Sequence, residues 1–182
     1  MQIPSHVFIF VQTPPFDIKR VRFLPMKIIL LAVGKTDVSW VRQGTELYCS
    51  RLSHYAPFEM KELPSLKNTS SMSKEQIKDK EGSLILDNIK DADEVLLLDE
   101  GGKEFSSVGF ASYIQDKMLR GGKNLVFVIG GAYGFSEEVY KRADGKVSLS
   151  KMTFSHQMVR AVFTEQLYRA FTIMKGEPYH HE

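Results

Sequence analysis

The stretch "FVIGGAYGFSEEV", residues 127–139, combines three features that together indicate the fold. An apolar, β-branched run stops at Gly130-Gly131, Gly134 follows, and Ser136 with two glutamates then opens a short helix. A buried strand that turns through glycines into a helix is the repeating unit of α/β proteins. Such glycines let a ligand approach the backbone. On this loop alone, however, a tight strand-to-helix turn explains them at least as well.

Outward from this stretch, apolar runs and helical periodicities alternate along the chain from Met26. Strands that are apolar on both faces and separated by helices predict an α/β fold, a mostly parallel sheet with helices on both faces. We expect the strand that begins at residue 94 to end in a turn at Gly101-Gly102. A capping-box pattern, Ser73 with Gln76, marks one helix start. The predicted strands are 27–33, 58–63, 94–99, 124–129 and 146–150, and the predicted helices are 40–55, 73–89, 108–118, 136–143 and 156–175.

Parallel sheets bind ligands beyond the carboxyl ends of their strands, which here are followed by three candidate loops, 98–104, 129–136 and 149–156. The glycine spacing at 130, 131 and 134 does not match the dinucleotide fingerprint, and no Lys-Ser/Thr pair forms a phosphate cradle. Bare backbone without phosphate-binding chemistry suits a flat, largely neutral group such as adenosine.

Length and composition limit the class of protein. The 182 residues, 43% apolar and 25% charged, indicate a single globular domain, and no run reaches the roughly 18 apolar residues that a membrane span needs. Cys49 is the only cysteine, which excludes an internal disulfide and a Cys-rich zinc site and suits the cytoplasm. A net charge of +2 does not by itself indicate a nucleic-acid partner. We expect residues 1–25 to be an N-terminal extension, with an edge strand as the alternative.

The C-terminal block "LSKMTFSHQMVRAVFTEQLYRAFTIMKGEPYHHE", residues 149–182, places Thr153 or Ser155 near a helix start and His156 in its first turn. The apolar face of this helix is interpreted as part of the core or as a dimer contact. For Arg160, Glu165 and His156 the residues alone leave two interpretations open, a functional site and a solvated helix face.

With these three loops in order, residues 26–182 resemble the ribosomal RNA large-subunit methyltransferase H family of the SPOUT superfamily. The matching stretches are "MKIILLAVGK" (26–35), "LLLDEGGKEFSS" (96–107), "FVIGGAYGF" (127–135) and the C-terminal block through Tyr179-His180. The resemblance implies a C-terminal trefoil knot, an exception to ordinary topology, and a homodimer without a metal. It also implies S-adenosylmethionine as cofactor and methylation of N3 of a pseudouridine in 23S ribosomal RNA, with the assembled 70S ribosome as partner.

Carried over by position, the family's cofactor contacts fall on the three candidate loops. The family often has Pro where this chain has Ser155, and a serine can cap the helix instead. The expected cofactor-binding residues are Leu98, Gly130, Leu149, Ser150, Lys151, Met152, Thr153 and Phe154.

The expected catalytic residues are His156, Arg160, Tyr179 and His180. Methyl transfer from a sulfonium needs alignment and removal of the proton on the attacking imide nitrogen. Either histidine is a candidate base, and Arg160 and Arg169 are candidates for anion contacts. Two alternatives stay open: a knotted methyltransferase that acts on transfer RNA, and a non-catalytic ribosome-binding factor of the same fold.

Overall fold

The structure, a computed structural model, describes residues 26–180 and contains a five-stranded sheet whose named strands all pair in parallel. The strand order is β2-β1-β4-β3-β5. The predicted extension, residues 1–25, lies outside the described residues. The predicted parallel sheet is confirmed, and its strands are β1 (Ile28–Val33), β2 (Phe58–Leu63), β3 (Glu94–Glu104), β4 (Leu125–Ile129) and β5 (Gly145–Ser148).

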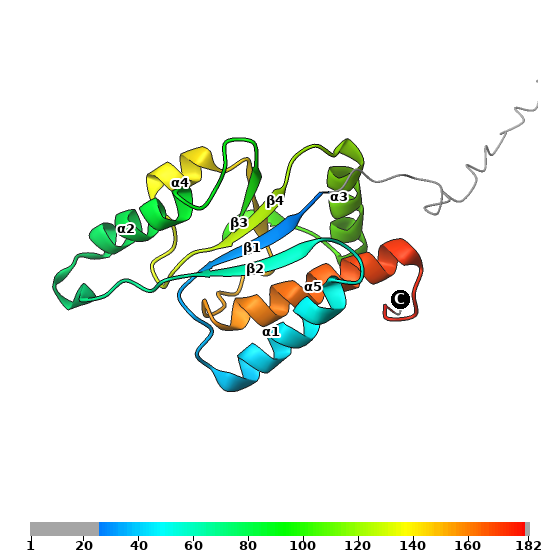
Figure 1. Cartoon of the computed structure of the whole chain (residues 1–182), viewed down its shortest axis with the longest axis horizontal. Coiled ribbons are helices and arrows are strands. Elements are labelled where there is room, and N and C mark those ends of the chain that lie inside the picture. Colours follow the sequence, from blue (N-terminus) through cyan, green and yellow to red (C-terminus); the bar gives the residue numbers. More distant parts are fainter. Residues whose placement is uncertain (1–25, 181–182) are drawn as a thin grey trace, which may run out of the picture.

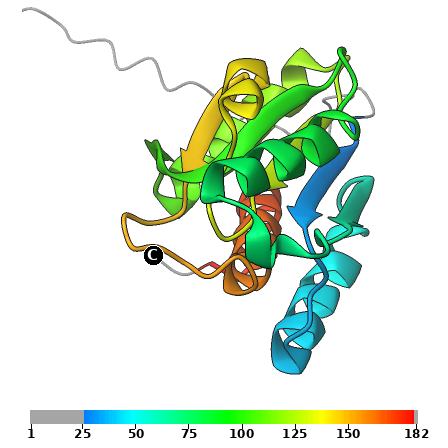
Figure 2. The same ribbon diagram turned by 90° about the vertical axis from the view of Figure 1, so that its left-hand side faces the viewer.

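Helices cover both faces of the sheet, as Figures 1 and 2 show from two directions. One face packs on α1, α3 and α5, and the other packs on α2 and α4. A 3-10 turn, η2 (Thr69–Ser71), precedes α2. The helices are α1 (Ser39–Leu52), α2 (Lys74–Leu86), α3 (Ser107–Arg120), α4 (Glu137–Arg142) and α5 (Met158–Lys175).

Two hydrophobic cores follow from the alternation of side chains along each strand. Phe127 of β4 points to one face and contacts the ring of Phe163 in α5, with centroids 4.6 Å apart. Its neighbour Val128 points to the other face, where it shares a core with Val139 of α4. Strands buried on both sides therefore need the continuous apolar runs that the sequence shows.

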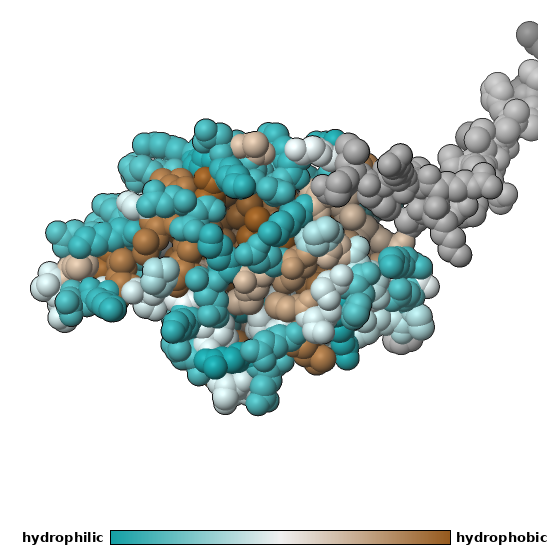
Figure 3. All heavy atoms as spheres, in the orientation of Figure 1, coloured by the Kyte–Doolittle hydropathy of each residue, from teal (hydrophilic) through white to brown (hydrophobic). Residues whose placement is uncertain are grey.

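The surface is mixed. Figure 3 shows hydrophobic side chains over the middle of one face, with hydrophilic side chains around them. Within residues 26–180, no helix has the length and apolar character to cross a membrane.

The helix ends confirm one prediction and correct another. Ser73 caps α2 with the full capping box, its hydroxyl accepting the Gln76 N–H at 3.2 Å. Helix α5 begins at Met158, so His156 lies just before the helix and not in its first turn. The N-cap position is Gln157, which makes no side-chain cap bond, and Ser155 two residues earlier accepts the Met158 N–H at 3.1 Å through its hydroxyl.

The predicted turn at Gly101-Gly102 is wrong. Strand β3 continues through both glycines to Glu104, and its pairing with β5 shifts register between Leu98 and Lys103. A Cβ on Gly102 would lie 2.7 Å from backbone atoms of β5. The glycine therefore permits a close approach of two backbones in a bulged strand, and it does not end the strand.

Candidate functional site

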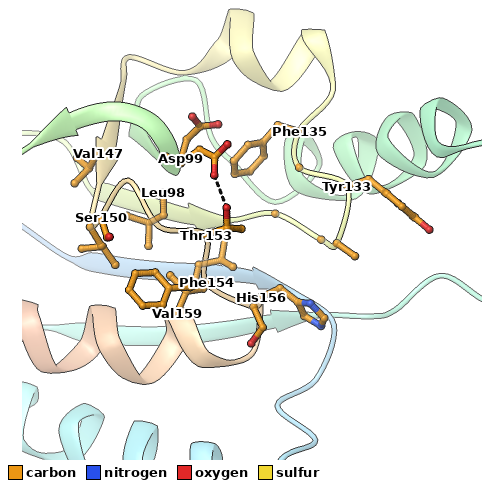
Figure 4. A pocket seen from close by; sticks show the side chains of 18 of the residues that line it. Leu98, Asp99, Tyr133, Phe135, Val147, Ser150, Thr153, Phe154, His156 and Val159 are labelled. Atoms are coloured by element: carbon orange, nitrogen blue, oxygen red, sulfur yellow. Dashed lines mark hydrogen bonds between the residues drawn. The ribbon is translucent and has the colours of Figure 1, made fainter.

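A cavity of about 670 Å³ lies at the carboxyl ends of β4 and β5 and beside the middle of β3, where Leu98, Asp99 and Glu100 line it. These strands are neighbours in the sheet, so the loops that follow β4 and β5 meet the bulged part of β3 there, and the candidate loop 98–104 is part of β3 itself. The cavity size is in the range of small-molecule sites. Figure 4 shows side chains that line it. The large aliphatic, Met and Phe side chains of the lining are Leu98, Ile129, Phe135, Val147, Leu149, Met152, Phe154 and Val159.

The structure brings together most of the expected cofactor-binding residues. Lys151 is the exception: its side chain is exposed, and its ammonium lies 3.8 Å from the Glu104 carboxylate. The loop turns at this point through a hydrogen bond of 2.9 Å from the Met152 N–H to the Ser150 hydroxyl. The expected residues that line the cavity are Leu98, Gly130, Leu149, Ser150, Met152, Thr153 and Phe154.

The glycine loop forms one wall of the cavity, but its glycines are explained by internal packing. A Cβ on Gly130 would lie 3.1 Å from the Gly134 carbonyl oxygen, and one on Gly131 would lie 2.3 Å from the Glu81 carboxylate of α2. Gly134 has φ of +81° and donates its N–H to the Gly131 carbonyl at 3.2 Å. The tight turn is therefore what these residues build, and it presents backbone to the cavity.

Two carboxylates, Asp99 and Glu100, stand where β3 leaves the core, and both line the cavity. Asp99 accepts the Tyr140 hydroxyl at 2.6 Å, and burial together with this bond raises the pKa of Tyr140 to about 12. Glu100 accepts the Thr153 hydroxyl at 2.7 Å, which joins two of the loops across the cavity (Figure 4, dashed line). Sequence reasoning selected this segment but missed both acids, although their place directly after the apolar run 95–98 was a usable signal.

The charge of the cavity is informative about its ligand. Among the lining residues that the structure describes there are two carboxylates, one histidine and neither lysine nor arginine. A phosphate group would find no cationic partner in this wall, whereas a ligand with positive charge would find two anionic ones.

His156 lies at the edge of the cavity, at the entrance to α5. Burial and the nearby positive charge of Arg160 lower the pKa of His156 below its ordinary value. A lowered pKa leaves the imidazole neutral at pH 7, which is the form that can accept a proton.

Arg160 is fully buried and its guanidinium joins three segments. Its Nη2 donates to the Val33 carbonyl at 2.8 Å, and its Nη1 donates to Thr36 Oγ1 at 2.8 Å and to Glu62 Oε1 at 3.2 Å. Its Nε donates to the carbonyl of His156 at 3.0 Å. The expected anion contact is therefore not available in this structure, because the protein itself uses these donors. Arg160 instead holds the backbone of His156 against the ends of β1 and β2.

Tyr179 and His180 lie in a second group, on the surface between α1 and α5. The Tyr179 hydroxyl is 3.1 Å from Glu165 Oε1 and 3.3 Å from the Tyr48 hydroxyl, and the Arg169 guanidinium lies 4.8 Å from the Tyr179 ring. Arg169 also pairs with Glu165 at 2.5 Å and lies 3.4 Å from His180 Nδ1. We call Tyr48, Glu165, Arg169, Tyr179 and His180 the C-terminal cluster.

The C-terminal cluster and the cavity share no residue. Along α5, Glu165 follows Val159, which lines the cavity, by six positions, and this corresponds to about 9 Å of helix rise. The structure thus divides the expected catalytic residues: His156 lies at the cavity, Arg160 is buried and holds the His156 carbonyl, and Tyr179 and His180 lie in the cluster.

Comparison with known proteins gives consistent matches. A family model described as predicted SPOUT methyltransferase matches residues 26–180. Two curated relatives, both named ribosomal RNA large subunit methyltransferase H, come from Christiangramia forsetii and Parabacteroides distasonis. The first is 60% identical over 86% of this chain and 99% of its own length, and the second is 55% identical over 86% and 100%.

A solved structure of a putative methyltransferase from Legionella pneumophila with bound SAM also matches. It is 11% identical, covers 82% of this chain and 67% of its own, and has a TM-score of 0.40. A likeness at this level supports no conclusion about the site.

Proposed function

The chain belongs to the ribosomal RNA large subunit methyltransferase H family of SPOUT methyltransferases, and we propose that it transfers a methyl group from S-adenosylmethionine to ribosomal RNA. The proposed acceptor is N3 of a pseudouridine in 23S ribosomal RNA within the assembled 70S ribosome, and the proposed location is the cytoplasm. The observation that carries the proposal is the cavity between β3 and the ends of β4 and β5, which is walled by backbone and apolar groups and has only carboxylates as charged residues.

The lining of the cavity fits the proposed cofactor. The glycine loop and the apolar residues suit the adenosine, and Asp99 and Glu100 offer negative charge to the cationic sulfonium and ammonium groups. When bound, S-adenosylmethionine supplies an electrophilic methyl group. Tyr140 keeps its proton because of its raised pKa, so it remains a donor that fixes Asp99.

The proposed work of the protein residues is positioning and proton removal. Holding two reactants in a near-attack geometry supplies about 7–11 kcal/mol. His156, neutral at pH 7, is the candidate acceptor for the imide proton, and Arg160 holds its backbone in place. The trefoil knot, implied by the family resemblance, stays a prediction.

The division of the site supports a homodimer in which the C-terminal cluster of one copy meets the cavity of the other. On α1, the helix beside the cluster, Trp40 and Leu47 are 59% and 48% exposed, and they lie two turns apart on one face. Gly44 lies between them, where a Cβ would be 3.9 Å from Ala161 of α5. Exposed large apolar side chains are typical of protein interfaces, and we propose that a second copy covers this face.

The direct test is to incubate the purified full-length protein with labelled S-adenosylmethionine and ribosomes from cells that lack the methyltransferase. We expect label in 23S ribosomal RNA, and mass spectrometry of the nucleosides should identify methylated pseudouridine. Label in transfer RNA would support the first alternative. Absence of cofactor binding in calorimetry would support the non-catalytic factor.

A further inference from the structure

Tyr133 is an exposed aromatic residue at the mouth of the cavity, and we propose that its ring is the surface on which an unpaired RNA base stacks during the reaction. The inference rests on the proposed function and specifies how the RNA is held. Tyr133 lines the cavity, but it is not among the expected cofactor-binding residues and does not belong to the C-terminal cluster. The residue is 46% exposed, although it belongs to a loop that begins and ends in buried residues, Gly130 and Phe135.

The backbone that carries Tyr133 is closely constrained. Gly131 and Gly134 form an antiparallel bridge on either side of it, and the Gly134 N–H donates to the Gly131 carbonyl at 3.2 Å. The Glu81 carboxylate of α2 lies against Gly131, so the loop is supported from that side as well. A loop whose backbone is fixed in this way loses little conformational entropy when its side chain binds a flat partner.

A cation lies beside the ring. The Lys74 ammonium is 5.8 Å from the Tyr133 ring centroid. Lys74 is the first residue of α2, directly after the Ser73 cap, so its backbone position is fixed by the capping box. An aromatic ring with an adjacent lysine matches the two chemistries of single-stranded nucleic acid, a base with a π-face and a phosphate.

The direction of the Tyr133 side chain favours contact of its ring with RNA over contact with the cofactor. In Figure 4, Tyr133 and His156 both point away from the deep end of the cavity at Leu98 and Val147, and toward the same side of its opening. A base that reached the methyl group from this opening would pass the candidate proton acceptor and the exposed ring together. Enzymes that modify a base take it out of its stack, and a stacking surface at the opening compensates part of that cost.

The experiment compares Tyr133→Ala, Tyr133→Phe and Lys74→Ala with the wild type and with Lys80→Ala, which removes an exposed charge from the same helix. We expect Tyr133→Ala to lower kcat/KM for ribosomes about tenfold, because loss of one stacking contact has this order of effect. Tyr133→Phe retains the stacking face and should stay within about twofold of wild type. Lys74→Ala should lower kcat/KM a few-fold, and Lys80→Ala should not.

Two further measurements separate the explanations. The affinity for S-adenosylmethionine, from calorimetry, and the elution volume in size-exclusion chromatography should be the same for Tyr133→Ala and wild type. A weaker cofactor affinity would assign the ring to the cofactor site, and a changed elution volume would assign it to contact between copies; either overturns the proposal. Unchanged kcat/KM in an active protein overturns the stacking alone. A wild type that methylates no RNA overturns the proposed function itself.

Discussion

The two polar groups that flank α5 differ in what holds them in place. At the cavity, His156 is fixed through Arg160, a fully buried side chain bonded to the ends of β1 and β2. In the C-terminal cluster, Arg169 and Tyr179 are held by partly exposed side chains of α1 and α5. The first group is therefore positioned by the core of its own chain, whereas the second is positioned by contacts near the surface.

The largest effect is expected when His156 and the C-terminal cluster are inactivated in different copies of the chain. A His156→Ala chain and a chain carrying both Tyr179→Ala and His180→Ala should each lose methylation. When both chains are co-expressed with different tags, the mixed dimers contain one intact pair of groups, so about half of the wild-type activity should return in the purified mixed species. The measurement is methyl transfer to ribosomes. Mixed dimers as inactive as the parents would contradict a site shared between copies.

The two arginines of α5 give the next largest contrast, in stability. Arg160→Met removes the cation that pairs with Glu62 and the donor to three acceptors, the Thr36 hydroxyl and the carbonyls of Val33 and His156. We expect the free energy of unfolding to fall by about 3–5 kcal/mol. Arg169→Met removes a partly exposed pair and should cost about 1 kcal/mol or less. Urea denaturation followed by circular dichroism measures both. Equal losses in the two variants would show that Arg160 has no special place in the core.

The pH dependence of the free energy of unfolding tests the lowered pKa of His156. Its pKa in the folded protein lies below the ordinary value of about 6.5, so the unfolded chain binds this proton at a higher pH than the folded one. The free energy of unfolding should therefore fall as pH drops through this range, by at most about 1.4 kcal/mol per pH unit. The neighbouring charges that act on the ring are Arg160, which lowers its pKa, and Asp37, which raises it.

In His156→Gln this part of the pH dependence should disappear. Denaturation at pH 7.5 and at pH 5.5 measures the difference for both proteins. An identical pH dependence in wild type and variant would contradict the lowered pKa.

The smallest expected effect concerns the bond that joins two loops across the cavity. Thr153→Val removes the hydroxyl that Glu100 accepts at 2.7 Å, and the affinity for S-adenosylmethionine should fall about fivefold, in line with roughly 1 kcal/mol for one hydrogen bond. Thr153→Ser keeps the hydroxyl and serves as the matched control. Calorimetry measures both affinities, and equal values for the two variants would show that this bond does not order the cavity.

The elements of the fold were predictable because their signals are local. Continuous apolar runs such as 124–129 indicate strands buried on both faces, and the Ser73 and Gln76 spacing indicates a helix start. The turn predicted at Gly101-Gly102 was wrong for a nonlocal reason: the segment that requires the glycine is β5, more than forty residues further along the chain. A glycine can indicate that a side chain would not fit at its position, but the sequence does not show which neighbouring segment leaves no room.

The sequence by itself determined the parallel α/β sheet, the three segments that line the cavity and the residues of the family resemblance. The periodicity of apolar residues and the direction of the strands decide these features, and both can be recognised from residues that are close together in the sequence. Only the tertiary structure decided the roles of individual polar side chains. It buried Arg160 among distant acceptors, moved Lys151 out of the cavity wall and brought in Asp99, Glu100 and Tyr140. The charge, burial and bonding of a side chain depend on neighbours that folding brings from elsewhere in the chain.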